Sequence, residues 1–188
     1  MKLCRIFADH LFSVKYDGGK RDVLNELFDK WEDTEYLYAY FENHRDLIEK
    51  GPWKDYTSEE LTDMAIDEGF EFYDRLCDIV DDSTQSLDDE FEFLNKESVE
   101  WQLVKYKAYG FPHNWSFKLK RNALLRLYAI KIDTNQYVIT GGGIKLVKEM
   151  REMPELGLEL ERLKKVRDWL LENNIHISQE VDSLLEED

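Results

Sequence analysis

The chain has few of the residues that mark membrane, disulfide-rich or metal-binding proteins. It has two cysteines, Cys4 and Cys77, and their separation fits neither a disulfide framework nor a zinc site. No apolar run reaches the roughly 18 residues of a membrane span, and the first residues lack the apolar core of a signal peptide. We therefore predict a cytoplasmic protein with buried free thiols, no metal, no cofactor and no membrane partner.

Apolar residues, by contrast, are plentiful enough to build a core. Hydrophobic residues make up 43% of the 188 positions and aromatic residues 13%, which argues against a disordered chain. Local patterns predict an α+β fold with a small antiparallel sheet and packed helices. We expect one domain over residues 1–177, with a helical elaboration at about 20–100, followed by an acidic tail at 178–188.

The expected elements follow from periodicity and turn chemistry. Short strands are predicted at 2–7 and 11–15, and helices at 22–30 and at 35–50, the latter with Thr34 as its cap. A capping box at residues 57–60 opens a third helix that runs to about residue 81 and has Phe70 among its expected core positions. A partly helical stretch is expected between 98 and 109.

The last third of the chain carries the clearest strand pattern. We predict a hairpin with strands at 124–133 and 136–140, a turn at residues 134–135, and an interruption of the pairing at glycines 141–143. The final helix begins at Pro154 and ends near Asn173. Glu152, Glu155 and Glu159 are expected to complement the dipole at its N-terminus.

Positive charge is scarce except in one segment. The net charge is −16, yet residues 101–151 hold ten Lys or Arg and two Asp or Glu. Residues 1–100 hold eleven basic and twenty-eight acidic residues, and residues 152–188 hold four basic and eleven acidic ones. This uneven distribution favours either an anion-binding face at 101–151 or an attraction between that segment and the acidic remainder.

A family resemblance appears in the same segment. An Arg-containing strand from Arg126 to Asp133, a turn, a hydrophobic return strand, a glycine run, a Lys-bearing stretch and an amphipathic helix with an acidic start follow one another. This order resembles the end of RelE/HigB-type toxins, over residues 115–173. The resemblance implies helices packed on a small antiparallel sheet, ribosome-dependent endonuclease activity on mRNA, and restraint by an antitoxin protein.

Cleavage of RNA without a metal needs cations that hold phosphates and a group that moves protons at the attacking 2′-hydroxyl. Arg126 and Tyr128 share one face of their strand because side chains alternate. We predict that Arg126 grips a phosphate, that Tyr128 stacks on a base or donates a proton, and that both line one open groove. The predicted catalytic residues are Arg126, Tyr128, Lys145 and His113, and the predicted RNA-binding residues are Lys118, Lys120, Arg121, Lys148 and Trp115.

Other interpretations of these residues stay open. The cations can be solvated residues of a sheet, some of them paired with acidic helices that then act as a built-in shield. The glycine run lacks the spacing and helix placement of a phosphate-binding loop, so a bend or bulge is the better interpretation. The alternative to a nuclease is a non-catalytic acidic protein that binds a basic partner or imitates nucleic acid.

Overall fold

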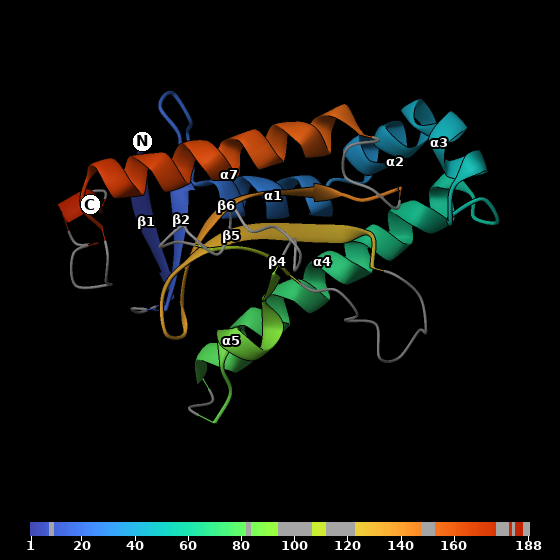
Figure 1. Ribbon diagram of the computed structural model, residues 1–188. Coiled ribbons are helices and arrows are strands. Elements are labelled where there is room, and N and C mark those ends of the chain that lie inside the picture. The colour runs from blue at the N-terminus through green and yellow to red at the C-terminus, as the bar shows by residue number, and fades with distance from the viewer. Residues whose placement is uncertain are drawn as a thin grey trace.

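Helices cover both faces of a single sheet, and the predicted α+β class is confirmed (Figure 1). The computed structural model describes residues 1–7, 10–81, 84–93, 107–111, 123–147, 153–175, 181 and 183–185. The strands are β1 (Lys2–Phe7), β2 (Leu11–Lys15), β3 (Glu92–Phe93), β4 (Lys107–Phe111), β5 (Leu125–Asp133) and β6 (Gln136–Ile144). The helices are α1 (Val23–Glu32), α2 (Thr34–Asn43), α3 (Arg45–Lys50), α4 (Ser58–Asp81), α5 (Leu87–Glu90) and α7 (Pro154–Glu172).

The sheet is mixed, whereas the sequence predicts an antiparallel one. Its strand order is β1-β2-β6-β5-β4-β3. β1 and β2 form the expected antiparallel hairpin, and β4, β5 and β6 are antiparallel neighbours. β2 pairs with β6 in parallel, over 11–13 and 137–139. The expected helical stretch at 98–109 is wrong at 107–109, because these residues belong to β4.

The predicted hairpin of β5 and β6 is present, and its glycines do not interrupt it. The turn residue Asn135 has a φ of 55°, a left-handed conformation that Asn tolerates well. β6 continues past the turn to Ile144, and Gly141 and Gly143 lie opposite Tyr128 and Arg126. The sequence-based expectation fails here because a glycine within a strand can also mark a site that another part of the protein approaches closely.

The irregularity in β6 lies just before the glycines. Ala129 pairs with Ile139 and Tyr128 pairs with Gly141, so Thr140 is the extra residue of a bulge. Its hydroxyl donates to the Tyr128 carbonyl at 3.2 Å. The bulge therefore re-aims the second half of β6 relative to the half that β2 covers.

Helices α1 and α2 begin with aspartate caps. The Asp22 side chain accepts from the amides of Leu24 and Asn25 at the start of α1. At α2 the cap is Asp33, which accepts from the Tyr36 amide at 2.9 Å, and Thr34 is already helical. The single helix expected at 35–50 is divided into α2 and α3.

Helix α4 opens with the predicted capping box. The Thr57 amide donates to Glu60 Oε2 at 2.8 Å, and the Glu60 amide donates to Thr57 Oγ1 at 3.2 Å. Phe70, expected in the core, is 53% exposed. Glu68 is buried instead, and its Oε2 accepts from the amides of Leu124 and Leu125 at 2.7 and 3.0 Å. The Glu68 carboxylate of α4 therefore fixes the backbone at the start of β5.

Helix α7 covers one face of the sheet, and α1 and α4 cover the other. A methyl group placed on Gly143 would meet Leu156 of α7, whereas one on the neighbouring Gly142 would meet Leu27 of α1. The two layers of the core therefore meet β6 from opposite sides. The buried positions of α7 are Leu156, Glu159, Leu163, Val166 and Leu170.

The described part of the acidic tail is packed against the sheet rather than loose. Val181 is buried, and Leu185 forms a parallel bridge with Leu3 of β1. Cys4 and Cys77 are not joined in a disulfide, but both are half-buried where burial was expected. Among the described residues, no helix has the length and apolar content needed to cross a bilayer.

Candidate functional site

Arg126 and Tyr128, the two central residues of the predicted nuclease site, lie beside each other on the α7 face of β5. Their cross-strand partners are Gly143 and Gly141, and a methyl group on either glycine would meet a side chain of α7. The predicted sharing of one face is therefore present in the structure. Arg126 is 8% exposed and Tyr128 is 1% exposed, so neither side chain lines an open groove in this structure.

The guanidinium of Arg126 donates hydrogen bonds to backbone carbonyls at the start of β5. Its Nη1 donates to the carbonyls of Ala123 and Leu125 at 2.9 and 2.6 Å. Burial lowers the pKa of Arg126, against the opposing effects of Tyr128 and Glu68. In this arrangement Arg126 Nη1 stabilises the start of β5.

The hydroxyl of Tyr128 lies in the same buried layer. Burial raises its pKa, Glu159 raises it further, and Arg126 opposes both effects. Within the described part of the chain this hydroxyl has no hydrogen-bond partner. Tyr128 therefore lies buried on the α7 face of the sheet.

Of the other predicted site residues, the structure describes Lys145. Lys145 lies just after β6, half-exposed, with its amide donating to the Leu124 carbonyl at 2.7 Å. Lys131, on the same strand as Arg126, is ion-paired with Asp88 of α5 at 2.7 Å. The remaining predicted site residues lie outside the described residues, namely His113, Trp115, Lys118, Lys120, Arg121 and Lys148.

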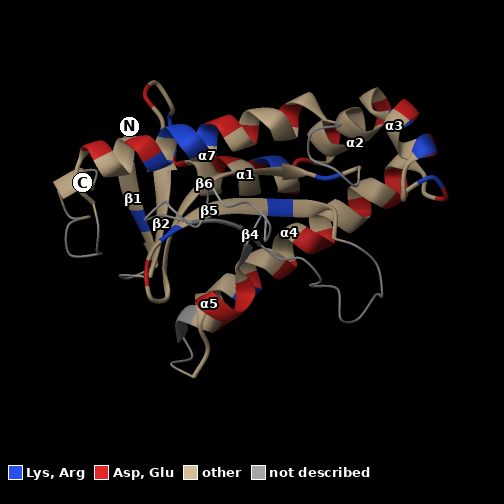
Figure 2. Ribbon diagram, viewed as in Figure 1, with Lys and Arg blue, Asp and Glu red and all other residues tan. Residues whose placement is uncertain are grey.

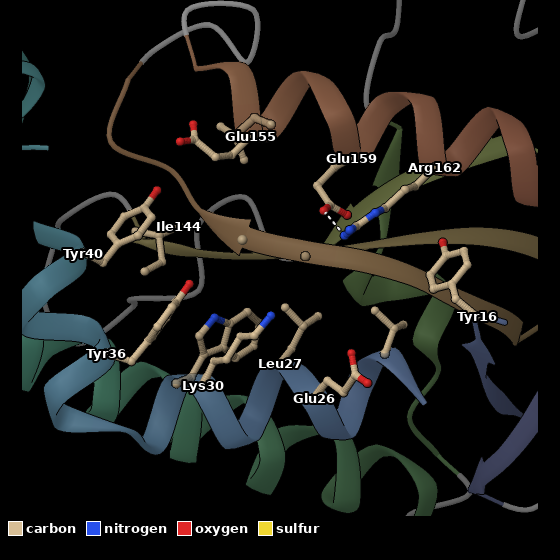
Figure 3. A pocket seen from close by; sticks show the side chains of 15 residues that line it. Tyr16, Glu26, Leu27, Lys30, Tyr36, Tyr40, Ile144, Glu155, Glu159 and Arg162 are labelled. Carbon is tan, nitrogen blue, oxygen red and sulfur yellow. Dashed lines mark hydrogen bonds and ion pairs between the residues drawn. The ribbon is translucent and has the colours of Figure 1, made fainter. Parts of the chain in front are cut away.

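A cleft opens at the edge of β6 that the sequence did not reveal. β2 covers β6 at 137–139, and beyond that point the outer edge of β6 faces a space of about 210 Å³ between α1 and α7. Gly142, Gly143 and Ile144 of β6 line it, and Ile144 is labelled in Figure 3. At one end the hydroxyl of Tyr16 donates to the Thr140 carbonyl at 2.7 Å. We name this space the α1–α7 cleft.

Glu159 of α7 is the buried carboxylate of this cleft, with 6% exposure. Its Oε1 accepts from Arg162 Nη1 at 2.6 Å, and the Arg162 guanidinium lies 5.8 Å from the centre of the Tyr16 ring. Its Oε2 has no hydrogen-bond partner among the residues that the structure describes. Burial raises the pKa of Glu159, while Arg162, the nearby Gly142 backbone amide and, more weakly, Lys30 hold it down.

Gly141 leaves room for this carboxylate. A Cβ at position 141 would lie 1.7 Å from Glu159 Oε2, so any side chain there would displace the carboxylate. A Cβ at Gly142 would lie 2.6 Å from the Arg126 carbonyl oxygen and 2.7 Å from Leu27 Cδ1. The glycine run is therefore explained by close packing on both faces of β6, and not by a turn.

The opposite end of the cleft is aromatic and acidic. Tyr36 and Tyr40 of α2 have ring centroids 6.2 Å apart, and Glu155 of α7 lies on the side of the Tyr40 hydroxyl (Figure 3). Burial and the charge of Glu155 raise the pKa of both tyrosines, so these hydroxyls stay neutral. His44 Nε2 lies 3.4 Å from Glu155 Oε1.

The sequence contained one signal that pointed to Glu159. It follows Leu156 by three residues and precedes Leu163 by four, which places it within the apolar stripe of α7 rather than beside it. A carboxylate at such a position is buried because the apolar stripe of the helix packs against the core. The interpretation of Glu159 as a partner of the helix dipole did not take this signal into account. Helix α2 and strand β6 contribute to the cleft through tertiary contacts, which the spacing of residues in the sequence does not predict.

A second notable feature is the outer face of α4. The helix contains nine acidic residues and one basic residue, and Figure 2 shows acidic residues repeating along it. The one basic residue, Arg75, is paired with Glu90. The exposed side chains that follow one stripe of the helix are Asp63, Asp67, Phe70, Glu71, Asp74 and Asp78. We name them the α4 face.

Among the described residues, no group of three His, Cys, Asp or Glu side chains is arranged to hold a metal ion. Comparison of the chain with protein-family models, with curated proteins and with solved structures found no match.

Proposed function

We propose that the chain is an interaction protein that binds a basic partner through the α4 face. The observation that carries this proposal is the continuous exposure of like charge along α4. From Asp63 to Asp78 the helix rises about 22 Å. Over this length its exposed acidic side chains form no ion pair within the described residues, and Arg75, the basic residue of the helix, is paired with Glu90. Such a face attracts and orients a positively charged surface.

Two exposed aromatic side chains add apolar contact area to this charge. Phe70 is 53% exposed and Tyr73 is 52% exposed. Tyr73 is held in place by an edge-on contact with Phe28, whose ring centroid lies 5.7 Å away. Ordered aromatic side chains are common anchors of protein interfaces because they bury much area at a small entropic cost.

The test uses two variants with the same net charge. The α4 variant carries Asp63→Lys, Asp67→Lys and Glu71→Lys, and the control carries Glu161→Lys, Asp168→Lys and Glu172→Lys on α7. Partners captured by the wild-type chain should be lost by the first variant and retained by the second. Binding should also weaken as salt is raised, because the charges are exposed. Equal losses in both variants, or salt-insensitive capture, would contradict the proposal.

The second candidate function is that of a RelE/HigB-like endonuclease on ribosome-bound mRNA, restrained by an antitoxin. What favours it is the adjacency of Arg126 and Tyr128 on one face, with Glu159 in the same layer. Because α7 covers both side chains, contact with RNA requires α7 to leave that face.

Expression in a bacterial host separates the two candidates. A toxin should arrest growth and cut mRNA, and Arg126→Ala should restore growth while the purified variant keeps its helical circular dichroism spectrum. Arg126→Lys, which keeps a positive charge, controls for the loss of the contacts to the Ala123 and Leu125 carbonyls. Harmless expression of the wild-type chain would remove the nuclease candidate and leave the interaction protein.

A further inference from the structure

Strand β2 covers only part of the outer edge of β6. It pairs in parallel with residues 137–139 of β6, and β6 continues to Ile144. Among the described residues, no strand pairs with this edge beyond Ile139. The edge from Gly142 to Ile144 lines the α1–α7 cleft instead. An outer edge of this kind carries backbone groups that can pair with another extended chain.

The pairing of β6 with β5 decides which backbone groups point into the cleft. The Lys145 amide donates to the Leu124 carbonyl, at the start of β5, with a distance of 2.7 Å. Backbone groups of successive residues in a strand point to opposite sides of it. The groups of Gly143 therefore point to β5, as those of Lys145 do, and the groups of Gly142 and Ile144 point away from β5 into the cleft.

Two contacts agree with this alternation. Thr140, two residues before Gly142, has its carbonyl on the outer side, where it accepts from the Tyr16 hydroxyl at 2.7 Å. The Gly142 amide lies close enough to the Glu159 carboxylate to hold down its pKa. The Gly142 carbonyl and both backbone groups of Ile144 are left as outward-facing groups that no described strand pairs.

The groups that flank Gly143 match one residue of a parallel strand. In a parallel pair, a residue donates to the carbonyl before the residue it faces and accepts from the amide after it. Strand β2 already pairs with β6 in parallel, and the Tyr137 amide donates to the His10 carbonyl at 2.9 Å. A guest residue opposite Gly143 can likewise donate to the Gly142 carbonyl and accept from the Ile144 amide. Such a guest would extend the row that β2 begins.

The walls of the cleft indicate which side chains suit the guest segment. A residue opposite Gly143 directs its side chain to the α7 face, because a methyl group on Gly143 would meet Leu156. The exposed Glu155 lines the cleft on that side, so a lysine or arginine suits this position. The flanking residues point to the α1 side, where Leu27 and Trp31 line the cleft, and apolar side chains suit them.

The volume of the cleft limits how much of the segment enters it. A space of about 210 Å³ holds about seven water-sized groups at about 30 Å³ each. The main chain of one residue, together with the peptide groups on either side of it, is of that size. The cleft therefore admits one bridging residue, and the neighbouring residues of the segment lie at its rim.

We propose that the α1–α7 cleft binds an extended segment of a partner protein, which pairs in parallel with β6 and carries a basic residue between two apolar residues. The basic residue makes two backbone hydrogen bonds around Gly143 and directs its charge to Glu155. In strand addition, main-chain hydrogen bonds supply affinity and alternate side chains supply specificity. This surface is separate from the α4 face, and the inference does not depend on the interaction proposed there.

Hydrogen exchange of the free chain tests the open edge without any ligand. The Ile144 amide should have a protection factor at least about tenfold lower than that of the Gly143 amide, because only the Gly143 amide is bonded to β5. Comparable protection of the two amides would show that the edge is already paired and would overturn the proposal.

Binding is tested by NMR titration of the full chain with the peptide acetyl-Thr-Val-Lys-Val-Thr-amide. The peptide should bind with a Kd of about 1 mM or tighter and shift the amide signals of Gly142 and Ile144. Methylation of the backbone nitrogen of its lysine removes the donor to the Gly142 carbonyl and should weaken binding by about tenfold. No shift of these signals at about 10 mM peptide, or equal binding of the methylated peptide, would contradict strand addition.

Two pairs of variants locate the peptide at the edge of β6. Ile144→Pro removes the outward amide and leaves the bonds to β5 in place, whereas Ile144→Val keeps that amide. Only the proline variant should bind the peptide about tenfold more weakly, and the melting temperature checks its fold. Glu155→Gln should also weaken binding by about tenfold, while Glu161→Gln, on the same helix outside the cleft, should not. Equal effects of Glu155→Gln and Glu161→Gln would show that the peptide binds elsewhere.

Discussion

Replacing Gly141 with alanine tests the packing of the buried carboxylate directly. The added methyl carbon would lie 1.7 Å from Glu159 Oε2, so the carboxylate must leave its position and strain its contact with Arg162. Overpacking of this kind costs about 1–3 kcal/mol, partly offset by about 0.4–1 kcal/mol from the reduced freedom of the unfolded chain. We expect a net loss of about 1–2 kcal/mol in the free energy of unfolding.

The matched control is Gly143→Ala on the same face of the same strand. Its methyl carbon would meet Leu156 Cδ2 at 3.4 Å, an ordinary contact. The free energy of unfolding should therefore change by less than about 0.5 kcal/mol, or rise slightly. Both variants keep the backbone of β6 and differ in what the new methyl group meets.

A double-mutant cycle supplies the decisive comparison. In a Glu159→Ala background the carboxylate is absent, and Gly141→Ala should be neutral or stabilising, giving a coupling of about 1–3 kcal/mol. The assay is urea unfolding followed by tryptophan fluorescence, with melting temperature as a second readout at about 2–4 °C per kcal/mol. If Gly141→Ala costs the same in both backgrounds, the carboxylate is not the reason for the glycine.

Two further predictions concern charge. Because burial raises the pKa of Glu159 above its ordinary 4.5, ionisation of this group costs stability as the pH rises from about 4.5 through the raised pKa. Glu159→Gln removes that loss. The unfolding free energy of the variant relative to that of the wild type should therefore increase from about pH 4 to about pH 7. A difference between the two that does not depend on pH would contradict this prediction. In the same urea titration, Asp88→Asn should lower the unfolding free energy by about 1–2 kcal/mol, since Asp88 binds Lys131 and the Tyr137 hydroxyl. The control Asp89→Asn, which changes an exposed neighbour, should leave the unfolding free energy nearly unchanged.

Features that depend on a few neighbouring residues were predictable from the sequence. The strands at 2–7 and 11–15, the capping box of Thr57 and Glu60, the turn at Asn135 and the start of α7 at Pro154 are all present. In each case the determining interactions lie within about four residues of one another, so the local pattern carries the information.

Features that depend on tertiary packing were not predictable in this way. The extension of β6 through the glycines needs the close approach of Glu159 and Leu27, which come from two different helices. The alternation of side chains correctly placed Arg126 and Tyr128 on one face, but which helix covers that face is a property of the whole fold. An arginine in a strand was therefore expected in a groove and is found beneath α7.

The bridge between Leu3 and Leu185 bears on how the protein avoids edge-to-edge association with a second copy. β1 is the outermost strand on its side of the sheet, and an unpaired outer strand is a template for pairing with another molecule. The C-terminal segment occupies part of that border, with Leu184 and Leu185 packed against the core beside it. These leucines therefore cover part of a margin that would otherwise be open to pairing with a second copy.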